Sequence, residues 1–206
     1  MGIAILCDTF DEEDRRCFAA RLRDGLAALR EVLARPGFGE GPASIGAEVE
    51  FSLVGDDEQP RPVNEAVIAE SGDPRLTVEL DRFNLEYNSR PVALAGRPFE
   101  ALAAELADAL GAAGRAAAQH GAHPIFVGIL PTVLEADLGL HAMTDTPRFR
   151  ALDAAIRRLR ERDFEVCIVG EDRLEKIFAD VTAEGANTSF PVHLRVAPRS
   201  FATMHA

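Results

Sequence analysis

The sequence predicts an α+β fold in which a mostly antiparallel sheet packs against long helices on one of its faces. Segments with a period of two residues, typical of half-buried strands, are interspersed with long segments of helical periodicity. The strands and helices do not alternate regularly, which disfavours a doubly wound parallel sheet. No glycine-rich phosphate loop occurs in the sequence, which excludes P-loop and Rossmann proteins.

The first long helix is expected over residues 11–35, because its apolar residues repeat at helical spacing and Pro36 follows. Asp8 or Asp11 is the candidate N-cap. Pro147 suits the first turn of a later helix, where a missing N–H has no consequence. The other expected helices are 64–70, 98–120, 147–162 and 173–180. The expected strands are 46–54, 75–80, 84–88, 123–130, 164–169 and 189–196.

Composition limits the classes of function. The 206 residues suit a single domain, here interpreted as a partial ligase catalytic domain over 1–206 preceded by a helical segment at 1–40. A net charge of −12 without a basic stripe argues against a nucleic-acid partner. No apolar run is long enough for a transmembrane helix, and the N-terminus does not resemble a signal peptide. Three cysteines without metal-type spacing are typical of a reduced, cytoplasmic protein.

Acidic residues embedded in strand-like segments are the main candidates for chemistry. Glu48 and Glu50 project from one side of an expected strand, about 6.5 to 7 Å apart. A surface strand could solvate them, but a second segment contains Glu79 and Glu86 in similar apolar surroundings. Glu79 and Glu86 are seven residues apart, so a bulge or turn at 81–83 must bring them to one face.

His193 and Arg195 have the polar parity of the last expected strand. If these strands adjoin, one face holds four carboxylates, an imidazole and a guanidinium. Such oxygen ligands suit Mg²⁺ or Mn²⁺ bound together with nucleotide phosphates, and Arg195 could neutralise charge in the transition state. His193 could equally be a core histidine, and Arg195 could form a structural ion pair.

Five short motifs follow one another between about residues 40 and 200. They are Gly46-x-Glu48-x-Glu50-Phe51, Glu79-Leu80 with Glu86 seven residues on, Gly121-x-His123-Pro124, Arg148-Phe149 and Ser189-Phe190-x-Val192-His193. In this order and spacing they resemble the glutamate–cysteine ligase and carboxylate–amine ligase superfamily.

The resemblance implies a glutamine-synthetase-like catalytic sheet that binds ATP and Mg²⁺ or Mn²⁺. The implied metal ligands are Glu48, Glu50, Glu79, Glu86 and His193; the implied nucleotide contacts are His193, Arg195 and Arg148, with Arg195 catalytic. The implied reaction phosphorylates the carboxylate of a glutamate-like acid, and an amine then displaces phosphate, as in glutathione-type biosynthesis. The partners are therefore small amino acids, with no nucleic acid and no membrane.

Two departures from the family pattern stand out. Many relatives have His-x-His on the last strand, where this chain has His193-x-Arg195. Relatives are usually longer, so the fold is expected to be incomplete at its C-terminus, with an open sheet edge that would favour homo-oligomers.

Two alternative functions stay open. One is a non-catalytic or truncated ligase-fold module that binds metal or nucleotide without turnover. The other is a hydrolase with paired carboxylates as acid and base. Sugar-binding clefts of that kind are usually lined with aromatic residues, and the absence of Trp and the single Tyr disfavour the hydrolase.

Overall fold

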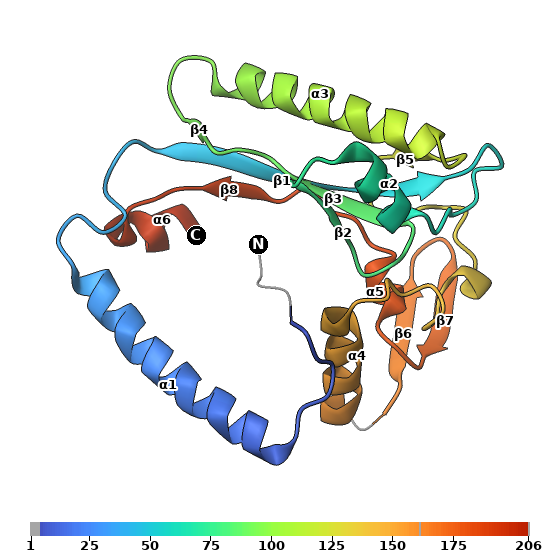
Figure 1. Ribbon diagram of the computed structural model, residues 1–206, viewed down its shortest axis with the longest axis horizontal. Coiled ribbons are helices and arrows are strands. Elements are labelled where there is room, and N and C mark those ends of the chain that lie inside the picture. Colours follow the sequence, from blue (N-terminus) through green and yellow to red (C-terminus); the bar gives the residue numbers. More distant parts are fainter. Residues whose placement is uncertain (1–4, 161, 206) are drawn as a thin grey trace.

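The strand β1 (Ser44–Val54) lies at the centre of a six-stranded antiparallel sheet in the computed structural model, which describes residues 5–160 and 162–205 (Figure 1). Its strand partners, two along each edge, are β3 (Asn84–Asn88), β4 (Val92–Ala93), β5 (His123–Ile125) and β8 (Val192–Leu194). β2 (Leu76–Val78) joins the sheet through β3. One long strand therefore connects segments that are far apart in the sequence, and the expected α+β class with an antiparallel sheet is confirmed.

The odd-numbered residues of β1 build the main core. Phe51 and Leu53 are completely buried and pack with Leu85 and Tyr87 of β3. Against them lie α2 (Asn64–Ser71) and α3 (Pro98–Ala118), whose buried alanines allow close approach to the sheet. Figure 1 shows α3 lying along this face. The apolar alternation thus directs one face of the sheet toward these two helices.

A second apolar cluster attaches the C-terminal half to the turn between β2 and β3. Leu80 packs with Met143, Val181 and Phe149, the last of which lies on α4 (Pro147–Arg160). Residues 142–144 also pair with the turn, because Arg82 N donates to Ala142 O (2.8 Å) and Thr144 N to Leu80 O (2.8 Å). This turn is therefore fixed from two sides.

The expected helix at 173–180 is wrong. This segment forms β7 (Arg173–Phe178), which pairs along its whole length with β6 (Phe164–Val169) in a hairpin, and Gly170 N donates to Asp172 O at the turn (2.9 Å). Periodicity cannot distinguish helix from strand in so short a segment, and pairing with β6 satisfies its backbone groups. The helix appears later, as α5 (Thr182–Gly185).

Three expected strands are shorter than predicted. β2 covers only Leu76–Val78 of the expected 75–80. β5 ends at Ile125 because the following residues pair elsewhere: Thr188 N donates to Gly128 O (2.8 Å), and Ile129 bridges Asn187. β8 covers only 192–194, although Ser189 O still accepts from Glu50 N (3.1 Å). The short helical segments that complete the fold are η1 (Glu135–Asp137), η2 (Pro198–Ser200) and α6 (Phe201–His205).

The helix α1 (Glu12–Ala34) begins at the N-cap Asp11, which forms a capping box with Asp14. None of its residues is buried, and it stands clear of the sheet in Figure 1. Its two flanks are held by ion pairs, Asp8–Arg150 (2.5 Å) and Glu40–Arg199 (3.2 Å). The predicted packing of long helices on one face thus describes α3 and not α1. In the described stretches of the chain, no helix combines the length and apolarity that a membrane span requires.

Candidate functional site

Carboxylates line the face of the sheet opposite to α2 and α3. Glu50 on β1 lies directly opposite Glu86 on β3, and Glu48 lies opposite Asn88. All of them are half-buried, on the alternate parity to the buried core residues. Like charges directly opposite each other on adjacent strands destabilise a sheet. The Glu50–Glu86 pair is therefore an unfavourable feature of the fold unless another group neutralises it.

Glu79 belongs to the same face. It follows β2, and its N–H donates to Asn84 O (3.4 Å), which continues the β2–β3 register and gives Glu79 the parity of Glu86. The two glutamates lie on two strands joined by a turn, so their separation of seven residues requires no bulge in a single strand.

The electrostatics show that the three carboxylates interact. Burial, reinforced by the negative charges of Glu86 and Glu50, raises the pKa of Glu79 to about 7, while Arg148 acts in the opposite direction. Arg148 is exposed at the start of α4, yet its charge reaches Glu79. The site thus combines three mutually repelling acids with one nearby base.

Buried polar residues fix the backbone that carries Glu79. Thr144 Oγ1 donates to Glu79 O (2.6 Å) and accepts from Asn64 Nδ2 (2.9 Å). The Asn64 amide also lies within hydrogen-bond distance of the carbonyls of Asp81 and Asn84 (3.2 Å each). Asn64 and Thr144 are completely buried, so this network is protected from competing water.

Other residues orient the acids themselves, and the sequence analysis did not assign them to the site. Ser189 donates to the Glu50 carboxylate from both its backbone N (2.7 Å) and its Oγ (2.9 Å). Asn88 Nδ2 (2.6 Å) and Thr77 Oγ1 (3.3 Å) donate to Glu86 Oε1. The parity of Thr77 with Glu79, and of Asn88 with Glu86, is the signal that could have identified two of them.

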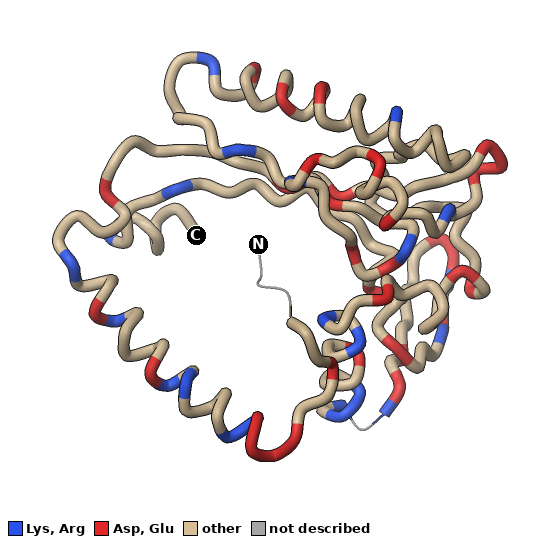
Figure 2. The backbone as a smooth tube through the Cα atoms, in the orientation of Figure 1, with Lys and Arg blue, Asp and Glu red and all other residues tan. Residues whose placement is uncertain are grey.

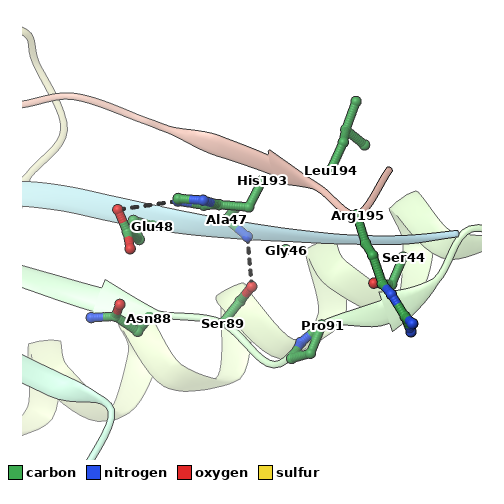
Figure 3. A pocket seen from close by; sticks show the side chains of 10 residues that line it. All are labelled: Ser44, Gly46, Ala47, Glu48, Asn88, Ser89, Pro91, His193, Leu194 and Arg195. Carbon is green, nitrogen blue, oxygen red and sulfur yellow. Dashed lines mark hydrogen bonds and ion pairs between the residues drawn. The ribbon is translucent and has the colours of Figure 1, made fainter. Parts of the chain in front are cut away.

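A shallow cavity of about 380 Å³ adjoins the acidic face between β1, β8 and the chain after β3 (Figure 3). Glu48 and His193 meet across it, with 3.2 Å between Oε2 and Nε2. Asn88 and Ser89 line the opposite side, and Ser89 Oγ accepts from Ala47 N (2.8 Å). The cavity therefore offers a carboxylate, an imidazole, an amide and a hydroxyl to one ligand.

Arg195 lies at the far end of this cavity. It pairs with Ser44, six residues along β1 from Glu50, which corresponds to about 20 Å. Its Nη2 donates to Glu40 O (2.6 Å), and Figure 3 shows the side chain directed away from Glu48. The structure thus gathers Glu50, Glu79 and Glu86, places Glu48 and His193 beside them, and does not bring Arg195 to the group.

The residues of this face fit divalent cations in chemical type. Carboxylate oxygens are the ligands that Mg²⁺ and Mn²⁺ prefer. A bound cation would offset both the burial and the neighbouring charges of Glu86 and Glu50 that raise the pKa of Glu79. Within 5–160 and 162–205, however, no three His, Cys, Asp or Glu side chains are gathered closely enough to hold a metal ion by themselves. Figure 2 shows acidic segments concentrated near β2, β3 and α5, whereas α1 carries both signs of charge.

Comparisons with known proteins give one positive result. Neither a curated protein nor a solved structure matches the chain. The family model for glutamate-cysteine ligase family 2 matches residues 44–170, the region that contains β1, the β2–β3 turn and the start of α4 with Arg148. This match covers more than half of the sequence, and the chain therefore belongs to glutamate-cysteine ligase family 2 (GCS2).

Proposed function

We propose that this chain provides the catalytic sheet of an ATP-dependent carboxylate–amine ligase that acts on a glutamate-like acid and a small amine. Family membership supports the ligase class. One observation carries the finer assignment: Glu50, Glu86 and Glu79 share one face, and burial, reinforced by the charges of Glu86 and Glu50, raises the pKa of Glu79 to about 7. A glutamine-synthetase-like arrangement of the sheet is part of this proposal.

Glu48, Glu50, Glu79 and Glu86 would hold Mg²⁺ or Mn²⁺. When bound, these ions would neutralise the phosphates of ATP. Because the carboxylates do not form a closed ligand set, the remaining ligands would come from phosphate oxygens and water, as is usual for Mg²⁺. The hydrogen bonds from Ser189, Asn88 and Thr77 would keep the carboxylates in place before substrate arrives.

In the proposed reaction a carboxylate oxygen of the acid attacks the γ-phosphorus of ATP and ADP leaves. The amine nitrogen then attacks the acyl carbon, and phosphate leaves as the amide forms. No protein nucleophile is needed, so the residues of the chain act by positioning and charge neutralisation. Arg148 is the base best placed to neutralise charge near Glu79, whereas Arg195 and His193 line the cavity and would contact the organic part of a substrate.

Thermal unfolding with Mg²⁺ and a non-hydrolysable ATP analogue tests the site. In the wild-type chain the ATP analogue should raise the melting temperature beyond the value in Mg²⁺ alone, and only when Mg²⁺ is present. The double variant Glu50→Gln/Glu86→Gln should lose this gain. Glu65→Gln, an exposed acid on α2, is the control and should keep it. An equal gain in the double variant would overturn the assignment of the site.

Turnover is tested separately by phosphate release that requires ATP, glutamate and an amine together. A second candidate, a module that binds nucleotide or metal without turnover, is favoured by one observation: Arg195 Nη2 bonds to Glu40 O and lies far from the carboxylates. A ligand-dependent gain in melting temperature without any phosphate release would support this second candidate over the ligase.

A further inference from the structure

A second acidic corner lies behind the turn between β2 and β3. Asp81 is completely buried, and neither of its carboxyl oxygens has a hydrogen-bond partner among the described residues. Two neighbouring acceptors are in the same condition, Asn84 Oδ1 and Ser52 Oγ. Buried polar atoms are nearly always paired, and an unpaired buried carboxylate is among the most unfavourable groups a protein can contain.

These unpaired oxygens lie close together in the fold. Asn84 N donates to Asp81 O (2.9 Å), so the two residues are the ends of one tight turn. Both side chains also reach the same glycine of α5, since Asn84 Nδ2 donates to Gly185 O and a Cβ on Gly185 would lie 2.9 Å from Asp81 Cγ. Ser52 is the cross-strand partner of Asn84. Glycine at 185 thus allows the Asp81 carboxyl to lie against α5 at a distance that any side chain would prevent.

The corner is electrostatically separate from the candidate ligase site. Burial raises the pKa of Asp81 to about 8, and the charges of Asp180 and Glu184 add to this effect. The acids that raise the pKa of Glu79 are Glu86 and Glu50, so the two groups share no member. No arginine or lysine in the described part of the chain lowers the pKa of Asp81, whereas Arg148 lowers that of Glu79.

We propose that this corner is a structural site for one hard divalent cation, held by the Asp81 carboxylate and Asn84 Oδ1, with Ser52 Oγ beside them and Asp180 and Glu184 at its mouth. Carboxylate, amide and hydroxyl oxygens are the donors that Ca²⁺ and Mg²⁺ accept, and both ions complete their shells with water. Glu184 is exposed and Asp180 is half-buried.

A cation in this position would fasten α5 to the turn that carries Glu79. Without a cation, α5 is attached to this turn by the apolar contact between Val181 and Leu80 and by the hydrogen bond from Asn84 Nδ2 to Gly185 O. The site would therefore stabilise the fold, independently of ATP and of the reaction proposed above.

The test is thermal unfolding in CaCl2 and, separately, in MgCl2, each titrated against EDTA and without nucleotide. At a concentration well above Kd, the melting temperature should rise by on the order of 5 °C and continue to rise with the logarithm of the ion concentration. The gain should persist in Glu50→Gln/Glu86→Gln and disappear in Asp81→Asn. Asp153→Asn is the matched control, because Asp153 is also a buried aspartate but pairs with Arg157 (3.2 Å), and it should keep the gain.

The opposite pattern overturns the proposal. If the gain disappears in Glu50→Gln/Glu86→Gln and persists in Asp81→Asn, the cation binds at the sheet face. If Asp81→Asn is at least as stable as wild type and neither protein responds to either ion, Asp81 is a buried neutral acid. Should Asp81→Asn fail to fold, calorimetric titration of Glu48→Gln/Glu50→Gln/Glu79→Gln/Glu86→Gln with CaCl2 decides: one bound ion per chain supports the proposal, and none contradicts it.

Discussion

The two faces of β1 differ in everything except their backbone. Phe51 and Leu53 point to one side and are fully buried under α2 and α3. Glu48 and Glu50 point to the other and meet like charge or an imidazole. Residues adjacent in sequence thus have opposite effects: the apolar residues stabilise the fold, and the Glu50–Glu86 pair opposes it by electrostatic repulsion.

Because the core residues and the candidate site residues lie on opposite faces of β1, stability and function can be tested by separate substitutions. A shift of the β1 register by one residue would exchange the two faces, so the apolar face also fixes the position of every carboxylate. Substitutions on the apolar face should reduce the free energy of unfolding, and substitutions on the polar face should leave it unchanged or raise it.

The largest expected effect is on the apolar face. Phe51→Ala should lower the free energy of unfolding by about 3 to 5 kcal/mol, because it removes a fully buried ring at the centre of the sheet. Denaturant unfolding measures the change, with Phe51→Leu as the milder control. A loss below about 1 kcal/mol would show that this face does not form the core.

The second-largest expected effect is the dependence of the free energy of unfolding on pH, which Asp81 should dominate. The pKa of Asp81 in the folded protein, about 8, lies above its ordinary value of 3.8, so the folded state holds a proton that the unfolded state releases. In EDTA the free energy of unfolding should therefore fall as pH rises from 5.5 to about 8, by on the order of 3 kcal/mol, and level off above that pH.

Asp81→Asn should remove most of this dependence of the free energy of unfolding on pH. Glu79→Gln should remove a smaller part, because the pKa of the Glu79 carboxyl is about 7. Asp153→Asn serves as the control. A pH profile of Asp81→Asn that coincides with that of wild type would show that Asp81 is ionised in the folded protein across this range.

The polar network beneath Glu79 should give an intermediate effect. Asn64→Ala should lower the free energy of unfolding by about 2 kcal/mol, because the Thr144 hydroxyl and two backbone carbonyls lose their donor. Asn88→Ala, at a half-buried position on the same sheet, is the control and should change it less. Equal losses in the two variants would mean that the buried network has no special role.

The smallest effect should have the opposite sign. Glu86→Gln should raise the free energy of unfolding by roughly 0.5 to 1 kcal/mol in EDTA, because it removes like charge directly opposite Glu50. Glu65→Gln on the other side of the sheet should not raise it, because Glu65 lies in the first turn of α2, where an acidic residue is favourable. In Mg²⁺, Glu86→Gln should instead be less stable than the wild-type protein. The Glu86 carboxylate would then destabilise the fold without the ion and stabilise it with the ion, which would sharpen the contrast between the two faces.

Much of this contrast could be predicted from the sequence. The alternation through Glu48 to Leu53 identified both faces of β1, and helical spacing located α1 and α3, because these are local patterns repeated over several residues. The family resemblance is confirmed by the match to residues 44–170. The assignment of metal and nucleotide contacts stays a prediction.

Other features depend on contacts that no local pattern encodes. Residues 173–178 are a strand only because β6 lies beside them, and β5 is short because Gly128 pairs with Thr188. The distance of Arg195 from Glu50 depends on the register of β8 with β1, which parity alone leaves undetermined. The burial of Asp81 requires Gly185, about a hundred residues further along the chain.

The central position of β1 also has a consequence for how the chain folds. Its partners begin at residue 84 and end with β8 at Leu194, so β1 cannot complete both edges until residue 194 has been synthesised. A topology dominated by such distant pairings folds slowly and leaves strand edges open in the meantime. During translation the nascent chain should therefore depend on chaperones, and should be prone to aggregation until β8 docks.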